Sequence, residues 1–127
     1  MQVPEDLKYT ESHEWVRLEG DLVKVGITEF AQSQLADLTF VDLPAVDSSV
    51  DAGDEVAVVE SVKAASDVYA PIAGTVVEVN EDLSDSPEKI NEDSFGEGWL
   101  FVLKPEDVSS LDGLLTPAAY RELLPDE

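Results

Sequence analysis

Alternating polar and apolar positions near the start of the chain predict a β-hairpin. Residues 13–19 and 21–28 form two β-like runs on either side of a Gly-Asp pair that favours a turn. Because successive side chains of a strand point to opposite faces, the even-numbered residues from Ser12 to Leu18 share one face. We therefore expect Glu14 at the polar margin of an apolar face.

Further short runs rich in β-branched and aromatic residues predict more strands. Turn signals stop them, and a loop over residues 47–55, centred on Gly53, separates two of them. Several short strands with turn signals at close spacing indicate an antiparallel sandwich or barrel. These predicted strands are residues 38–43, 55–61, 67–70, 74–80 and 99–104.

Short helices are expected at the periphery, where capping residues and proline mark their first turns. Residues 81–98 lack a periodic pattern and are expected to be a long polar connection. The predicted helices are residues 29–37 with Thr28 as N-cap, residues 105–111 with Pro105 in the first turn, and residues 117–124 with Thr116 as N-cap.

Composition limits the chain to one domain, residues 1–127, with its own core. Its 127 residues and 43% apolar content suit a folded chain of this size. The chain has no cysteine, which excludes disulfides, thiolate nucleophiles and cysteine-based metal sites. It begins without the basic and apolar segments of a signal peptide and contains no apolar run of roughly 20 residues, so we expect a cytoplasmic protein.

The formal net charge of −22 excludes the usual ways of binding nucleic acid or an anionic membrane, since both need basic patches. Two interpretations remain: an acidic protein with basic partners, or a protein adapted to a salt-rich cytoplasm. The acidic residues are spread along the whole chain without a single acidic block, which favours salt adaptation.

The candidate signals for catalysis and metal binding do not meet the requirements of such sites. The single histidine, His13, is expected to be a surface or structural residue and not a catalyst. Residues 81–93 do not match a calcium loop: counted from Asp82, Pro87 stands at the sixth position, where glycine is required, and Asp93 at the twelfth, where glutamate is required. Ser61 has no base nearby in the sequence to activate it as a nucleophile. We therefore expect no catalytic residue and no metal site.

Lys63 is different, because it lies between two predicted strands at the expected tip of a hairpin. It is one of only seven cationic residues in the chain. A tip is exposed on a rigid support, and the amine of a lysine can form an amide with a carboxylic cofactor. Such an arm can carry a group between active sites. On position alone, an ordinary surface lysine explains Lys63 equally well.

The segment VESVKAASDVYAPIAGTVVEVNE, residues 59–81, resembles the lipoate-attachment segment of the glycine cleavage H-protein family. The resemblance continues through YTESHEWVRLEGDLVKVGITEFAQSQLADLTFVDLP before it, and through INEDSFGEGWL and LLTPAAYREL after it. It spans nearly the whole chain. It implies a barrel-sandwich hybrid of antiparallel sheets with short peripheral helices, including a C-terminal helix.

The resemblance also implies a function as a lipoyl carrier with lipoate bound covalently to Lys63. The arm would carry an aminomethyl group from glycine decarboxylase (P protein) to the tetrahydrofolate-dependent aminomethyltransferase (T protein). Dihydrolipoyl dehydrogenase (L protein) would reoxidise it, and a lipoate-attaching enzyme would install it. The carrier, expected to be a monomer, would catalyse no step itself.

By the same resemblance, a cleft formed by Ser12, Glu14 and Asp67 would protect the aminomethyl-loaded arm from water. Two carboxylates and a hydroxyl suit an ammonium group. Two alternatives stay open: an unmodified scaffold of the same fold, and a carrier of another acyl group. The chain departs from the family at Asp47, where the family often has glycine.

Overall fold

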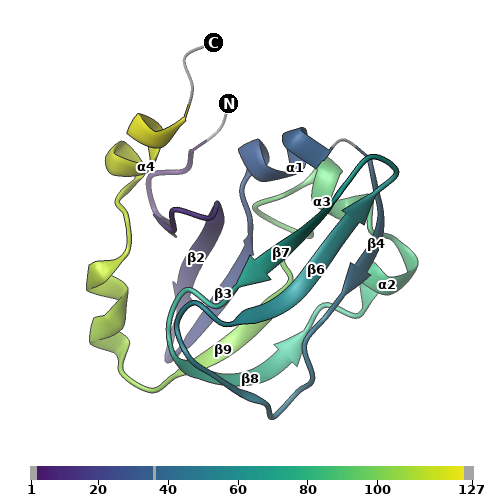
Figure 1. Ribbon diagram of the computed structural model, residues 1–127. Coiled ribbons are helices and arrows are strands. Elements are labelled where there is room, and N and C mark those ends of the chain that lie inside the picture. The colour runs from purple at the N-terminus through teal and green to yellow at the C-terminus, as the bar shows by residue number, and fades with distance from the viewer. Residues whose placement is uncertain (1–2, 36, 125–127) are drawn as a thin grey trace.

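Two antiparallel sheets form the framework of the protein, shown as a computed structural model in Figure 1, which describes residues 3–35 and 37–124. The larger sheet has the strand order β1-β2-β3-β9-β8-β5, and the smaller one has the order β4-β6-β7. The mainly β prediction is confirmed. The strands are β1 (Lys8–Tyr9), β2 (Glu14–Glu19), β3 (Leu22–Ile27), β4 (Leu38–Asp42), β5 (Ser49–Val50), β6 (Glu55–Ser61), β7 (Ala65–Tyr69), β8 (Gly74–Val79) and β9 (Phe101–Pro105).

The first predicted hairpin is confirmed as β2 and β3. Glu19 pairs with Leu22 across the turn, and Gly20 has a φ of 63°. Positive φ is the conformation that glycine adopts without steric cost, which is why the turn forms there. In the larger sheet, β9 lies between β3 and β8. The centre of this sheet is therefore formed by segments that are far apart in the chain.

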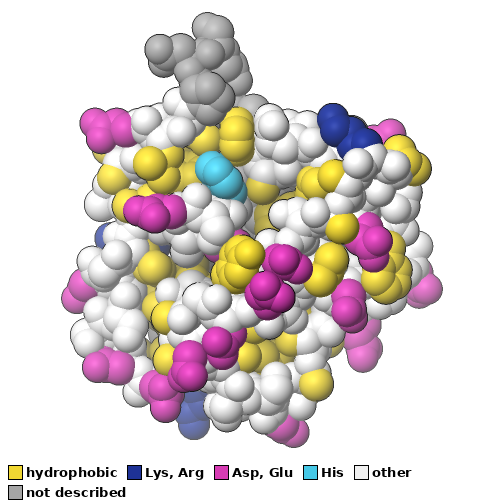
Figure 2. All heavy atoms as spheres, viewed as in Figure 1, with side chains coloured by type: hydrophobic (Ala, Val, Ile, Leu, Met, Phe, Trp, Pro, Cys, Tyr) yellow, Lys and Arg dark blue, Asp and Glu magenta, His cyan; other side chains and the backbone are white. Residues whose placement is uncertain are grey.

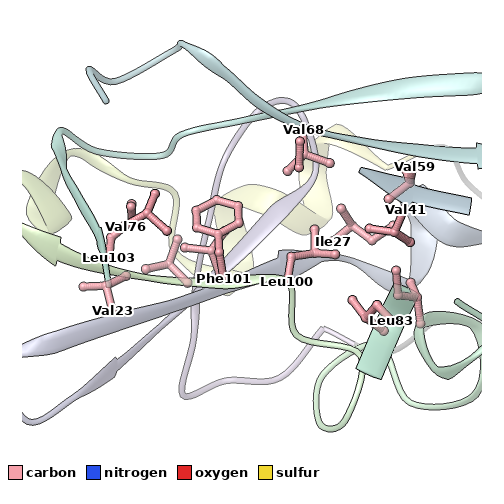
Figure 3. Packing of buried hydrophobic residues seen from close by; sticks show 14 of the residues in the cluster. Val23, Ile27, Val41, Val59, Val68, Val76, Leu83, Leu100, Phe101 and Leu103 are labelled. Atoms are coloured by element: carbon pink, nitrogen blue, oxygen red, sulfur yellow. The ribbon is translucent and has the colours of Figure 1, made fainter. Parts of the chain in front are cut away.

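The core lies between the two sheets, where buried apolar side chains from both sheets form one cluster. Figure 3 shows Val59 and Val68 of the smaller sheet on one side and Phe101 and Leu103 of β9 on the other. A second, smaller cluster around Trp15 and several aromatic residues packs the C-terminal segment against the larger sheet.

The prediction that residues 81–98 form only a polar connection is wrong. Two single-turn helices lie within this segment, α2 (Asp82–Asp85) and α3 (Lys89–Glu92). Each buries one apolar residue completely, Leu83 in α2 and Ile90 in α3. A single apolar residue per turn leaves no periodicity in the sequence, so only the tertiary packing reveals these helices.

Two smaller predictions also need correction. The predicted loop over residues 47–55 contains strand β5, which pairs with β8. The helix predicted to start at Pro105 is instead a 3₁₀ helix, η1 (Val108–Gly113), with Asp107 as its N-cap, because Pro105 is the last residue of β9. Its missing N–H thus limits the strand without starting a helix.

The other two predicted helices are confirmed with their caps. The helices are α1 (Glu29–Leu35) and α4 (Pro117–Leu123). The side chain of Thr28 accepts a hydrogen bond from the amide of Ala31, and Thr116 caps α4 in the same way through Ala119. The predicted end of the first helix includes Ala36, which lies outside the described residues.

Acidic side chains are spread over the visible face of the molecule (Figure 2). Four ion pairs form within the described residues, and the acid in each pair is well exposed. The pairs are Arg17–Glu19, Lys24–Glu19, Lys89–Asp82 and Arg121–Glu5. These pairs involve three acidic residues, Glu5, Glu19 and Asp82, of the 29 in the chain.

Candidate functional site

The predicted position of Lys63 at the tip of a hairpin is confirmed. Strands β6 and β7 pair in antiparallel register as far as Glu60 and Ala65, and residues 62–64 form the turn beyond them. Lys63 is exposed, and its neighbour Val62 is 88% exposed. The β6–β7 hairpin lies at the front of the molecule in Figure 1, with its tip at the end far from β2.

Ser61 holds the backbone of this tip. Its hydroxyl oxygen accepts hydrogen bonds from the amides of Lys63 (3.3 Å) and Ala64 (3.2 Å). Its own amide donates to the carbonyl of Ala64 at 2.8 Å. A serine that binds the backbone of the following turn is a local motif that rigidifies the turn. Ser61 therefore fixes the base of Lys63 while the side chain stays free.

The amine of Lys63 is accessible for chemistry. Within the described part of the chain it has no ion-pair partner, unlike Lys24, Lys89 and both arginines. An unpaired, exposed amine on a fixed backbone fits attachment of a carboxylic cofactor through an amide bond. A flexible lysine stem above a rigid tip also lets an attached group reach other surfaces of the molecule.

A cleft of about 300 Å³ lies at the other end of β7. Strand β7 runs from the tip toward β2 (Figure 1). The backbone amide of its last residue, Tyr69, donates to the side chain of Glu14 at the start of β2. The cleft thus lies at the far end of the strand that leaves the tip. Its walls come from residues 9–12, Glu14, Gly53, residues 69–71 and residues 113–115.

Glu14 is the most unusual residue of this cleft, because its side chain is a carboxylate with only 1% of the residue exposed. Its Oε1 accepts hydrogen bonds from the hydroxyls of Thr10 (2.5 Å) and Ser12 (2.6 Å). Its Oε2 accepts one from the amide of Tyr69 at 3.3 Å. Glu14 shares its face with buried Val16 and borders the polar cleft, but it is buried more deeply than a margin position implies, because β2 buries both faces where it begins.

Burial raises the pKa of Glu14 above its ordinary value, because a carboxylate loses hydration energy inside the protein. Hydrogen bonds from Ser12, Thr10 and the Tyr69 amide act in the opposite direction. They favour the ionised form, since each donates to a negative oxygen. An ammonium group entering the cleft would favour the ionised form further.

The three residues expected to form the cleft are only partly brought together. Ser12 and Glu14 are hydrogen-bonded and line the cleft. Asp67 is exposed, pairs with Val58 in the sheet, and is not among the residues that line the cleft. It lies two residues before Tyr69 and therefore on the same face of β7. Asp67 is thus placed between the tip and the cleft.

His13 has a structural environment. Its Nδ1 is hydrogen-bonded to the hydroxyl of Tyr120 at 2.8 Å, and its ring contacts Phe30. The Tyr120 hydroxyl also bonds to Thr28 at 2.7 Å. Burial lowers the pKa of His13. These contacts attach α4 to the end of β3 and the start of α1, which accounts for the single histidine without catalysis.

In residues 3–35 and 37–124, no group of three or more acidic or histidine residues is arranged to hold a metal ion. None of the helices described is long and apolar enough to cross a membrane.

Sequence reasoning missed two residues of the site. Ser61 carried a detectable signal, since a serine directly before a tight turn often bonds to its backbone. Thr10 carried none: it precedes β2, and only the folded chain brings its hydroxyl to Glu14.

Comparison with known proteins agrees with this geometry. The family model described as glycine cleavage H-protein matches residues 7–127. A glycine cleavage system H protein of Halorhodospira halophila is 59% identical over 99% of this chain and 98% of its own length. One from Xanthomonas campestris pv. campestris is 58% identical over 99% of this chain and 97% of its own length.

A solved structure supports the same assignment. The crystal structure of a glycine cleavage system H protein from Mycobacterium marinum matches with a TM-score of 0.87 and 42% identity, covering 94% of this chain and 97% of that one. Sequence and fold therefore agree over nearly the whole length. The chain belongs to the glycine cleavage H-protein family, the lipoyl carriers of the glycine cleavage system.

Proposed function

We propose that Lys63 carries lipoate as an amide and that this modification is confined to Lys63. Glycine cleavage H proteins carry lipoate, and the observation that supports Lys63 as its site is the exposed, unpaired amine at a tip fixed by Ser61. Lipoate bound there supplies a disulfide that can be reduced, loaded and reoxidised at the end of a flexible arm.

We further propose that Ser12, Glu14 and Asp67 receive the aminomethyl cargo of the arm. Its ammonium group needs anionic and polar partners, and Glu14 offers a carboxylate inside a cleft that limits contact with water. Ser12 orients that carboxylate through its hydroxyl. Asp67, exposed on β7 between the tip and the cleft, would attract the ammonium on its way.

Family membership implies interaction with the P, T and L proteins. We propose in addition that a lipoate-attaching enzyme acts on the exposed tip, that the carrier is a monomer, and that it catalyses no step itself. A location in the cytoplasm stays a prediction. An unmodified scaffold and a carrier of another acyl group are the alternatives that the first experiment decides between.

The site of attachment is tested by mass spectrometry on protein from its native host. We expect intact mass to show one lipoyl increment, and a digest to place it on Lys63. Lys63→Arg should abolish the increment, because arginine keeps the charge but is not acylated. Lys24→Arg, a change at a paired surface lysine, serves as the control and should leave modification complete.

Three outcomes decide against this part of the proposal. An absent increment supports the scaffold, and an increment of different mass supports another acyl group. Modification that persists in Lys63→Arg would show that the tip lysine is not the site.

The cleft is tested by the lifetime of the cargo. Glu14→Gln and Asp67→Asn should both be lipoylated like the wild type, because neither residue is in the tip. Loaded with the aminomethyl group and separated from the T protein, both variants should release ammonia faster, Glu14→Gln roughly tenfold, since it loses a charged partner in a buried site. Asp85→Asn, an exposed acid in α2 that is not among the residues lining the cleft, is the control. Equal rates in all four proteins would mean that these acids are ordinary surface charges.

A further inference from the structure

We propose that Thr10 is a positioning residue that fixes the carboxylate of Glu14 for the ammonium group of the cargo. The proposal rests on the cleft function proposed above and deepens it. Thr10 does not resemble a site residue in the sequence, and its role follows from the geometry of the folded chain.

Thr10 and Glu14 are joined by three hydrogen bonds. The amide of Thr10 donates to the carbonyl of Glu14, and the amide of Glu14 donates to Oγ1 of Thr10, both at 3.0 Å. The hydroxyl of Thr10 then donates to Oε1 of Glu14 at 2.5 Å. The backbone of Glu14 therefore orients the hydroxyl that holds its own carboxylate. Such a closed set of bonds leaves the side chain one well-defined orientation.

The donors divide unequally between the two carboxylate oxygens. Oε1 receives two hydroxyls, from Thr10 and Ser12, at short distances. Among the residues that the structure describes, Oε2 receives only the Tyr69 amide, at 3.3 Å. Each carboxylate oxygen has about two lone pairs, so Oε1 is fully used while Oε2 can accept another donor. The arrangement thus reserves one oxygen of Glu14 for a cation.

Thr10 also acts on the charge of Glu14. A carboxylate at this depth is driven toward its neutral form by burial, and a neutral acid does not pair with an ammonium group. A hydroxyl that donates to Oε1 stabilises the ionised form. Without the Thr10 hydroxyl, the acid would stay protonated to higher pH, and less of it would be ready to bind the cargo at neutral pH.

The experiment compares Thr10→Val, which has the same shape without the hydroxyl, with Thr10→Ser, which keeps the hydroxyl. Thr39→Val removes an exposed hydroxyl on β4, away from the cleft, as the control. The titration of the Glu14 carboxyl carbon is followed by NMR in the unmodified protein. Ammonia release is then measured in the loaded protein over a range of pH, with Glu14→Gln as the reference for complete loss.

We expect Thr10→Val to raise the pKa of Glu14 and to speed ammonia release roughly fivefold to tenfold at neutral pH, which corresponds to the net contribution of one ordinary hydrogen bond. The effect should shrink at higher pH, where Glu14 ionises without help. Thr10→Ser and Thr39→Val should match the wild type in both measurements.

An unchanged Glu14 titration in Thr10→Val overturns the proposal, even if ammonia release is faster, because Thr10 would then only support the loop. Failure of the underlying cleft function looks different. If Glu14→Gln releases ammonia at the wild-type rate, the cleft does not protect the cargo. In that case, the NMR titration of Glu14 alone supports or overturns the role of Thr10 in positioning the carboxylate.

Discussion

At the scale of single residues, Glu14 and Lys63 depend on opposite environments. Lys63 works by exposure, and an exposed lysine at a turn is visible in the sequence because the turn signals around it are local. Glu14 works by burial. The sequence predicted a position at the polar margin of an apolar face and not its depth, whereas the fold surrounds it with Thr10, Ser12 and the Tyr69 amide. A residue's depth depends on packing from distant segments, which the local pattern does not contain.

Asp47 adopts a backbone conformation that favours glycine. Its φ is 75°, and its amide donates to the carbonyl of Val76 at 2.7 Å. Left-handed conformations crowd the Cβ of other residues, although aspartate tolerates them better than most. Asp47 therefore has a glycine-like backbone, at a position where the family resemblance led us to expect glycine.

Substitution at Asp47 tests this conformation. Asp47→Gly and Asp47→Ala remove the same charge, so the difference between them reports the backbone alone. We expect Asp47→Gly to exceed Asp47→Ala in free energy of unfolding by about 1 kcal/mol, measured by urea denaturation. At Asp51, whose φ is not positive, the order should reverse, because glycine there only adds flexibility to the unfolded chain. Equal stability of the two Asp47 variants would contradict the strain.

At the scale of elements, the structure divides into those that carry their own signals and those that depend on others. The hairpins β2–β3 and β6–β7 and the capped helices α1 and α4 have alternation, turn residues or N-caps within their own sequence. The elements α2, α3 and β5 do not, because each is short and stabilised by a single buried side chain or by pairing with β8. Sequence analysis found the first group and missed the second.

The C-terminal helix shows how an element can be predicted while its role is not. Thr116 and Pro117 predict where α4 begins. They do not show that Tyr120 stacks on Tyr9 with ring centroids 4.6 Å apart and bonds to His13 and Thr28. Burial raises the pKa of Tyr120 to about 12, so its hydroxyl stays neutral and can donate in this network. The segment before α4, residues 113–115, forms one wall of the cleft.

For the whole molecule, charge is the dominant property. The four ion pairs within the described residues involve four of the seven cations, against 29 acids in the chain. Unpaired carboxylates spread over the surface repel one another, and this repulsion opposes the compact state (Figure 2). The screening length falls from about 10 Å at 0.1 M salt to about 3 Å at 1 M. Salt should therefore remove most of the repulsion.

We expect the midpoint of thermal unfolding at neutral pH to rise markedly from dilute buffer to molar potassium chloride. Most of the rise should occur below about 1 M, where screening changes most. The same series in sucrose is the control, because sucrose stabilises proteins by exclusion from their surface and does not screen charge. It distinguishes stabilisation by screening from stabilisation by exclusion of the solute. A midpoint that does not change with salt would show that the fold tolerates its acids, and the acidity would no longer indicate a salt-rich cytoplasm.

The sequence by itself determined the mainly β fold, two hairpins, two capped helices and the exposed position of Lys63, because turns, caps and alternation act over a few residues. Only the tertiary structure decided the depth of Glu14, the contact with Thr10, the position of Asp67 outside the cleft and the burial of Leu83 and Ile90. The contact with Thr10 joins residues only four positions apart and depends on the turn between them. The other features require segments far apart in the chain to meet. Their energy comes from burial and from hydrogen bonds across that distance, which no local pattern encodes.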